Sequence, residues 1–255
     1  ACERFFQEDT ILATVMTVQN ELGYIMPIKE VCGLRDKYAP WALVHTDAVQ
    51  ALGKVPLPLR EWGVDMASFS AHKIGGPKGI GALYVKRGTH LFTTAFGGGQ
   101  ERGLRSGTEA VFLIAGFAEA MKQTYATFDV DRRATRSLWN YLVKRLRSEI
   151  PSVIINSRED GSPYICNITV PGMNNQKALD YLSDNGIYIS KAAACESNHT
   201  TVAPGTWRPK HPLSLQAAGI PLSLGRNTLR ISFGYDTTQG TVDRFVDVLV
   251  AYLAQ

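Results

Sequence analysis

The stretch VDMASFSAHKIGGPKGIGALYV, residues 64–85, joins two short apolar strands through a polar, glycine-rich turn. The first strand, Val64–Phe69, runs into a hydroxyl, an imidazole and an amine in SAHK, residues 70–73. The glycines and the proline that follow are typical of a tight chain reversal. A lysine at such a strand end is either a solvated surface charge or an amine held in place for chemistry. The rest of the chain has to decide between the two.

Strands and helices alternate around this stretch. Apolar runs predict strands at Ile11–Val18 and Trp41–His45, and the pattern between them, Ile28–Ala39, is helical. Another strand, Gly79–Val85, follows the polar turn. This rhythm is typical of an α/β protein with a mostly parallel, doubly wound sheet. We therefore expect a large domain over residues 1–115.

The second half of the chain predicts a smaller α+β domain over residues 116–255. A helical pattern from Thr108 to Ile150, broken by charges at Asp129–Arg133, connects the two domains. Strands are expected at Val153–Asn156, Tyr164–Val170, Ile187–Ser190 and Thr228–Phe233, and helices at Gln176–Asn185 and Gln239–Ala254.

Composition and charge exclude several classes of protein. The 27 basic residues exceed the 23 acidic ones by four and are scattered, which argues against a nucleic-acid partner. No run approaches about 18 apolar residues, so we expect no membrane span, and residues 1–10 lack the pattern of a secretory signal. The cysteines Cys2, Cys32, Cys166 and Cys195 lack zinc-site spacing. We expect free thiols, no metal and a cytoplasmic location.

Polar side chains follow three strands of the large domain at the point where each strand ends. In open α/β sheets, ligands bind at the carboxyl ends of the strands. Asp47 and Lys73 are 26 positions apart, about one strand–helix–strand unit, so both can reach the same sheet edge. The residues at these strand ends are Asn20, then Asp47 and Gln50, then Ser70, His72 and Lys73.

This set of side chains suits pyridoxal phosphate. An amine such as Lys73 can bind the aldehyde of the cofactor as a Schiff base, which a substrate amine displaces. A carboxylate such as Asp47 keeps the pyridine nitrogen protonated, so that the ring accepts electrons from the substrate. Ser70 and His72 are suitable phosphate donors. Taken singly, however, Lys73 reads as a surface charge and Asp47 as a helix cap.

Four motifs together resemble the cysteine desulfurase family of fold-type I pyridoxal phosphate enzymes. They are TVQNELGYIMPI (17–28), HTDAVQALGKV (45–55), the stretch at 64–85 and GGGQERGLRSGT (97–108). The resemblance runs from about Glu3 to the C-terminus. It implies a doubly wound, mostly parallel sheet in the large domain and the smaller α+β domain after it.

The resemblance also implies how the cofactor is held. Lys73 would form the Schiff base, with His72 beside it as a second catalytic residue. Asp47 would contact the pyridine nitrogen, and Gln50 would donate to the ring hydroxyl. Ser70 and His72 would bind the phosphate.

Four further residues gain roles from the resemblance. Asn20 and Arg230 would bind the substrate carboxylate, which a planar guanidinium suits. Thr108 would reach across a homodimer to the phosphate in the partner subunit. Cys195, in KAAACESN, would be the catalytic cysteine that takes sulfur from L-cysteine as a persulfide, leaves L-alanine, and passes the sulfur to an acceptor or scaffold protein in iron–sulfur cluster assembly or thiolation.

Cys195 taken by itself would read as a small buried residue. The Pro- and Gly-containing stretch after it, residues 198–212, instead suggests an exposed loop, where functional residues are common. Cys195 and Arg230 are 35 positions apart, a longer spacing than expected for the family subgroup with the closest cysteine motif. The acceptor of the sulfur is therefore left open.

Family members begin well before the QNELG motif, and their earlier part supplies a glycine/threonine phosphate loop and a histidine stacked on the cofactor. Nothing before Asn20 matches either feature. We expect an incomplete large domain, in a fragment, a natural truncation or a half-enzyme completed by a second polypeptide.

Two other classes stay open. The first is a related pyridoxal phosphate enzyme, such as a cystine or selenocysteine lyase or a class V aminotransferase, which needs no thiol at Cys195. The second is a truncated, non-catalytic homologue that serves as a partner-binding subunit.

Overall fold

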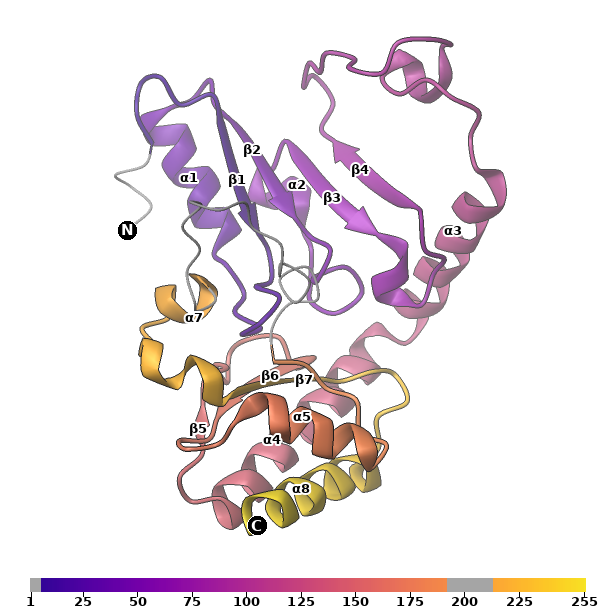
Figure 1. Cartoon of the computed structure of the whole chain (residues 1–255). Coiled ribbons are helices and arrows are strands. Elements are labelled where there is room, and N and C mark those ends of the chain that lie inside the picture. Colours follow the sequence, from indigo (N-terminus) through magenta and orange to yellow (C-terminus); the bar gives the residue numbers. More distant parts are fainter. Residues whose placement is uncertain (1–5, 192–212) are drawn as a thin grey trace, which may run out of the picture. The chain divides into compact units, whose positions relative to one another are not determined.

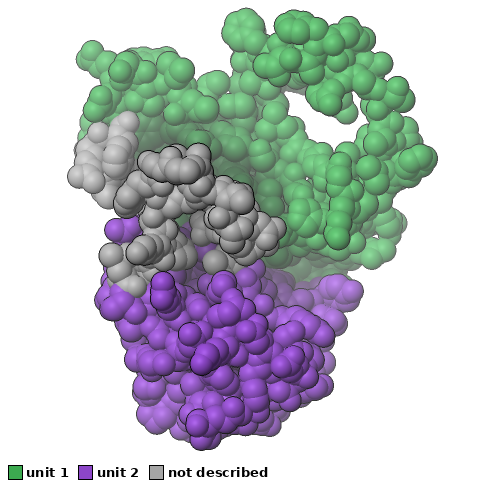
Figure 2. Space-filling model, viewed as in Figure 1, with its two compact units in different colours: residues 1–18, 26–128 green, residues 19–25, 129–255 purple. Residues whose placement is uncertain are grey.

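The computed structural model describes residues 6–191 and 213–255, which fold into two compact units. Unit 1 comprises Ala1–Val18 and Met26–Phe128, and unit 2 comprises Gln19–Ile25 and Asp129–Gln255 (Figure 2). The short segment 19–25 thus lies between two parts of unit 1 in sequence but belongs to unit 2. The boundary expected at residue 115 falls inside a helix of unit 1.

Unit 1 is built on a four-stranded sheet with the strand order β1-β2-β3-β4 (Figure 1). The β1–β2 and β2–β3 pairs are parallel, and β4 is antiparallel to β3 because the GGPKG turn reverses the chain directly. The expected α/β fold with a mostly parallel sheet is confirmed. The strands are β1 Leu12–Met16, β2 Leu43–Asp47, β3 Met66–Ser70 and β4 Gly81–Val85.

Helices cover one face of this sheet. Ile28, Val31 and Cys32 of α1 pack with Val44 of β2 and with Val64 in a buried apolar cluster. A second cluster joins Phe117 of α3 to the β3–β4 turn. The helices of unit 1 are α1 Ile28–Tyr38, α2 Leu59–Trp62, η2 Ala71–Ile74, η3 Gln100–Gly103 and α3 Val111–Ala126.

The opposite face, called the open face below, carries both exposed apolar side chains and a row of polar ones. Leu12, Met16 and Leu83 are 49%, 37% and 51% exposed. Between them, the Oγ1 of Thr14 lies 2.7 Å from Nδ1 of His45. The Nε2 of the same imidazole lies 2.8 Å from the Oγ of Ser68. These three polar residues form a ladder across β1, β2 and β3, because register places Thr14 opposite His45.

Unit 2 contains a three-stranded antiparallel sheet in the order β5-β6-β7. One face packs on α4, α5 and α8 in a core that includes Trp139, Leu146, Ile168, Leu229 and Phe245. The strands are β5 Ile154–Ile155, β6 Ile165–Thr169 and β7 Thr228–Ser232. The helices are α4 Phe128–Glu149, α5 Asn175–Asp184, α7 Leu213–Ala217, η4 Leu222–Asn227 and α8 Gln239–Leu253.

Side-chain caps explain where two of these helices begin. The Asn174 side chain accepts hydrogen bonds from the N–H groups of Gln176 and Lys177 at the start of α5. The Thr238 side chain accepts from the N–H of Thr241 at the start of α8. Each cap satisfies backbone donors that the first helical turn leaves unpaired.

The structure differs from the sequence-based expectation at two elements. The long helical pattern from Thr108 to Ile150 is broken at Thr127, just before the charged cluster, and yields α3 and α4. The strand expected at Ile187–Ser190 is reduced to a single bridge between Ser190 and Arg230. In the described parts of the chain, no helix is long and apolar enough to cross a membrane.

Candidate active site

The ends of β2 and β3 place the predicted cofactor residues at one edge of unit 1. Asp47 is the last residue of β2 and Ser70 is the last of β3. The two strands are parallel neighbours, with Asp47 in register with Ser68. The N–H of Ala48 donates to the Ser68 carbonyl at 3.0 Å and continues the pairing past the strand end. Side chains on alternate residues share a face, so Asp47 and Ser70 extend the face that carries His45 and Ser68.

Ser70, His72 and Lys73 form the second part of this edge. The Oγ of Ser70 lies 2.7 Å from Nδ1 of His72. His72 and Lys73 occupy the single turn η2, which ends at Gly75 in the left-handed region with a φ of +79°. Only glycine adopts that conformation without strain. Both side chains are exposed, so the Lys73 amine is open to a solute.

Asp47 and Gln50 follow β2 in a tight turn. One carboxylate oxygen of Asp47, Oδ1, accepts the N–H of Val49 at 2.9 Å, and the side chain is otherwise exposed. Gln50 is half-buried, and its Oε1 accepts from Nζ of Lys54 at 3.3 Å. The local bond to Val49 fixes the orientation of the carboxylate without burying it.

The donor set at this edge fits pyridoxal phosphate. It offers a carboxylate at Asp47, a carboxamide at Gln50, a hydroxyl–imidazole pair at Ser70 and His72, and an exposed primary amine at Lys73. These groups match a ring nitrogen, a ring hydroxyl, a phosphate and an aldehyde, respectively. In the described residues, no group of three or more His, Cys, Asp or Glu side chains is placed to hold a metal ion.

Thr108 lies on a different part of unit 1. It is exposed, in the segment that precedes α3, and it lines a cavity of about 790 Å³ together with Leu83, Arg105 and Ile114. The wall of this cavity contains neither Ser70 nor His72. Within one chain, therefore, the structure does not bring Thr108 to the other predicted phosphate ligands.

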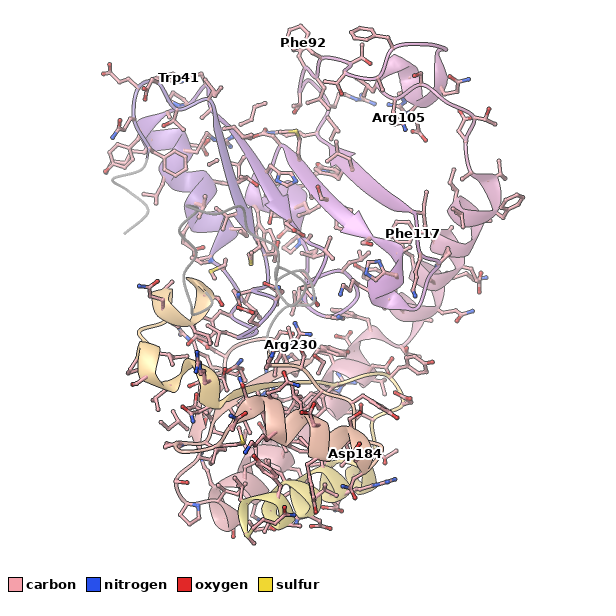
Figure 3. The ribbon with its side chains drawn as sticks, in the orientation of Figure 1. Trp41, Phe92, Arg105, Phe117, Asp184 and Arg230 are labelled. Atoms are coloured by element: carbon pink, nitrogen blue, oxygen red, sulfur yellow. The ribbon has the colours of Figure 1, made fainter. Side chains whose placement is uncertain are left out.

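Asn20 and Arg230, the predicted substrate residues, meet in unit 2. Arg230 lies on β7 (Figure 3). It donates from Nη1 to the backbone carbonyl of Asn20 at 3.2 Å. Both side chains are half-buried. The guanidinium is thus oriented by a main-chain oxygen of the turn that carries the other predicted substrate ligand.

Cys195 lies outside the described residues, as does Cys2. The two described cysteines, Cys32 and Cys166, are free and buried. Burial raises the pKa of the Cys166 thiol to about 12 and is also the main cause that raises the pKa of Cys32. Neither has the low pKa that makes a thiol reactive at neutral pH.

Two features of the site region were missed by the sequence analysis. The first is the Thr14–His45–Ser68 ladder, whose members are separated by more than 20 positions and meet only through strand register. The second is the membership of segment 19–25 in unit 2. The alternation of side chains along each strand could have predicted that the ladder residues share a face. The sequence carries no local signal that segment 19–25 belongs to unit 2.

Known proteins resemble this chain in sequence and in fold. Residues 1–245 match the aminotransferase class-V family. A cysteine desulfurase IscS from Dictyoglomus turgidum is 33% identical over 97% of this chain, which covers 60% of that enzyme. The chain therefore spans about three fifths of the length of such relatives.

Solved structures agree with this relationship. A NifS-like protein superposes with a TM-score of 0.87 at 33% identity, over 99% of this chain and 63% of that protein. SspA in complex with cysteine gives a TM-score of 0.69 at 30% identity, over 91% of this chain and 61% of that protein. The polar strand ends, the mixed sheet and the family match lead to one conclusion: the chain belongs to the class-V aminotransferase family, among fold-type I enzymes.

Proposed function

We propose that this chain carries the cofactor and substrate residues of a pyridoxal phosphate-dependent cysteine desulfurase. The observation that supports this most is the joint position of Asp47, Ser70, His72 and Lys73 at the ends of two adjacent parallel strands. The relative named above as a cysteine desulfurase supports the same activity. The substrate would be L-cysteine, and the products L-alanine and a protein-bound sulfur.

The residues of unit 1 would hold and orient the cofactor. Ser70 and His72 would bind its phosphate, and Asp47 would hold a proton on its ring nitrogen. Gln50 would donate to the ring hydroxyl, and Lys73 would bind the aldehyde and later move a proton at the substrate α-carbon. The bound cofactor supplies an electron sink for that carbon.

The residues of unit 2 would bind the substrate. The Arg230 guanidinium offers paired N–H donors that suit an α-carboxylate, and the Asn20 carbonyl holds that guanidinium at 3.2 Å. Cys195 would attack the substrate sulfur as a thiolate, so that an S–S bond forms as the substrate Cβ–Sγ bond breaks. The electron pair of the broken bond would stay on the carbon skeleton, which takes up protons and leaves as alanine, and Cys195 would keep the sulfur as a persulfide for a sulfur-acceptor protein. A cytoplasmic reducing environment suits such chemistry, because it keeps the attacking thiol free.

A homodimer would cover the apolar surface of α3 and the segment before it. The first half of α3, VFLIAGFA (residues 111–118), carries no polar side chain on any side, yet among the residues of α3 only Phe117 is buried. Phe112 is 84% exposed, and Phe92, in the segment before α3, is 96% exposed (Figure 3). A helix that is apolar all round is normally buried. A second copy of the chain would bury these rings and bring Thr108 to the partner's phosphate.

The open face points to a further polypeptide. Leu12, Met16 and Leu83 are exposed there, and in the described residues β1 and β4 pair on one side only. Open strand edges of this kind need a cover. We propose that a segment equivalent to the remaining two fifths of the relatives covers them, in the same chain or as a second polypeptide. Adding that segment in trans should increase cofactor binding and sulfide release.

The experiment that tests the function measures sulfide release from L-cysteine and absorption in the visible range, with pyridoxal phosphate added. We expect coloured protein and sulfide release that both disappear in Lys73→Ala. Lys78→Ala is the matched control, because Lys78 is an exposed lysine in the same connection between β3 and β4. A colourless protein even with the covering segment supplied would refute the proposal, and equal loss in both variants would refute the role of Lys73.

A further inference from the structure

The turn Gln19–Ile25 is built into unit 2 by bonds to residues far along the chain. The Oγ of Ser157 donates to the Leu22 carbonyl at 2.6 Å. The N–H of Ser162 donates to the Gly23 carbonyl at 2.8 Å, and the Tyr24 hydroxyl donates to the Asn156 carbonyl at 3.0 Å. The Oγ of Ser214 donates to the Glu21 carboxylate. These bonds hold four consecutive residues of the turn, 21–24, to unit 2.

The turn is also braced from within. The Gln19 side chain accepts the N–H groups of Glu21 and Leu22, and the N–H of Gly23 donates to the Gln19 carbonyl at 2.9 Å. Gly23 has a φ of +74°, and a Cβ there would lie 3.1 Å from the Cβ of Ile165. Only a glycine permits both the conformation and this close approach to β6.

Ser157 connects this turn to the strand beside Arg230. Ser157 is 7% exposed. Its hydroxyl accepts a hydrogen bond from the N–H of Asn167 at 2.8 Å and donates one to the carbonyl of Leu22. Asn167 is the direct partner of Arg230 in the β6–β7 register. Arg230 in turn donates to the carbonyl of Asn20, in the same turn as Leu22. The contacts therefore run from the turn through Ser157, Asn167 and Arg230 and back to the turn.

We propose that Ser157 is a positioning residue for the substrate carboxylate. It holds the turn so that the Asn20 carbonyl orients the Arg230 guanidinium, which in turn receives the carboxylate. The inference rests on the proposed function for the identity of the ligand, but the positioning itself depends only on contacts within unit 2. The Ser157 hydroxyl binds the backbone of Leu22 and Asn167, so its loss should weaken substrate binding and leave the chemical step intact.

The test compares Ser157→Ala with Ser162→Ala. Both remove a buried serine hydroxyl from the same segment. Ser162, however, holds the turn through its backbone N–H, which alanine retains. Only Ser157→Ala removes the donor to Leu22 and the acceptor for Asn167.

Two readouts need no activity. Hydrogen exchange of the Glu21, Leu22 and Gly23 amides should be at least about tenfold faster in Ser157→Ala than in Ser162→Ala. Modification of Arg230 by phenylglyoxal, mapped by peptide mass, should also be faster in Ser157→Ala. Unchanged exchange would overturn the role of Ser157 in holding the turn. Unchanged Arg230 modification would overturn the link from the turn to the guanidinium.

The third readout is the KM for L-cysteine of the cofactor-loaded protein. We expect Ser157→Ala to raise KM about tenfold, with kcat within about twofold. A displaced Asn20 carbonyl would misplace the Arg230 guanidinium, and one hydrogen bond from a charged group to the carboxylate is worth about tenfold or more. A fall in kcat at constant KM would overturn the inference. A parent protein without desulfurase activity would refute the proposed function, while exchange and arginine modification still decide the positioning.

A second variant tests the same contact if Ser157→Ala does not fold. Tyr24→Phe removes the bond from the Tyr24 hydroxyl to the Asn156 carbonyl at the edge of the same turn. It should speed exchange of the same amides in the same direction as Ser157→Ala. If Ser157→Ala does not fold and Tyr24→Phe leaves exchange unchanged, the inference fails.

Discussion

Arg230 donates from Nη1 to the main-chain carbonyl of Asn20, 3.2 Å away and 210 positions earlier in the chain. Both residues belong to unit 2, whereas Asp47, Ser70 and Lys73 belong to unit 1. The two proposed binding tasks are therefore carried by different folded units. Substitutions in unit 2 should therefore change substrate affinity without changing cofactor affinity.

Replacing Arg230 by lysine should weaken substrate binding. An ammonium keeps the charge but loses the paired N–H donors, so we expect KM for L-cysteine to rise about tenfold to a hundredfold with cofactor absorption unchanged. Steady-state kinetics and the visible spectrum measure the two effects. Arg226→Lys, at an exposed arginine of η4, is the control. A matching rise in KM in that control would contradict the specific role.

Reduction with borohydride should label Lys73. The amine is exposed at the sheet edge beside the Ser70–His72 pair, where an aldehyde held by its phosphate would meet it. Peptide mapping should place the pyridoxyl group on residue 73 and find none on Lys78. We expect Lys73→Ala to lower activity by about 10² or more. A label on any other lysine would contradict the assignment.

The cysteines should differ sharply in reactivity. Burial raises the pKa of Cys166 to about 12 and also raises that of Cys32, so both stay protonated and unmodified near neutral pH. We expect Cys195 to be alkylated first of the four thiols, as found by mass mapping after brief iodoacetamide treatment. Cys195→Ser should abolish the persulfide. Sulfide release by Cys195→Ser at the parental rate would exclude a persulfide on this residue.

Asp65 should make unit 1 sensitive to acid. Burial alone would raise the pKa of this carboxyl, but hydrogen bonds from the Val44 N–H and the Arg35 guanidinium outweigh it and hold the pKa below its ordinary value. The carboxylate lies 2.6 Å from Arg35 Nη1, and both residues are buried. A depressed folded-state pKa contributes stability above the unfolded pKa of about 3.9, and that stability is lost as pH falls through the folded value.

Asp65→Asn should therefore lower the free energy of unfolding at pH 7 by about 3–5 kcal/mol, because it removes the buried carboxylate of the pair and leaves the buried Arg35 with only the exposed Asp36 as a charged partner. The parent should lose stability below about pH 4 more steeply than Asp65→Asn. Urea unfolding at the two pH values measures both. Asp36→Asn, at a 68% exposed partner of the same arginine, should cost about 1 kcal/mol or less. Equal losses in the two variants would contradict the argument.

Phe112→Asp should weaken self-association. Its ring is 84% exposed on α3 and would lie in the proposed dimer interface. Removing a buried phenylalanine costs about 1.5–3 kcal/mol, so the dissociation constant should rise about tenfold or more. Light scattering over a dilution series measures it. Tyr235→Asp, at a 95% exposed ring in unit 2, is the control. An unchanged dissociation constant in Phe112→Asp would place the interface elsewhere.

Sequence patterns predicted the strands of unit 1 because each apolar run ends in polar or glycine residues. The expected Val64–Phe69 became β3, Met66–Ser70, and Trp41–His45 became β2, Leu43–Asp47. The meeting of Asp47 and Ser70 at one edge also followed, since parallel strands end at a common edge. The break in the long helix was expected at the charges from Asp129 onward but lies at Thr127.

The rest depends on contacts that sequence spacing does not encode. The turn 19–25 joins unit 2 through main-chain carbonyls, one of them bound by Ser157 from 135 positions away. Any residue supplies such a carbonyl, and the partners of the Glu21 and Tyr24 side chains lie more than 130 positions away, so no local spacing marks the turn. The expected strand Ile187–Ser190 failed for a related reason, because its apolar alternation meets β7 only at Ser190.

The ladder of Thr14, His45 and Ser68 sets a condition on whatever covers the open face. On β1, apolar Leu12 and Met16 flank the threonine, so a covering segment needs apolar side chains at its margins and polar groups over its centre. A uniformly apolar segment would bury the hydroxyl groups of Thr14 and Ser68 without partners for their remaining hydrogen bonds. Each buried unsatisfied group would cost about 1–3 kcal/mol. The same three side chains would therefore favour the correct covering segment and disfavour association with unrelated apolar surfaces.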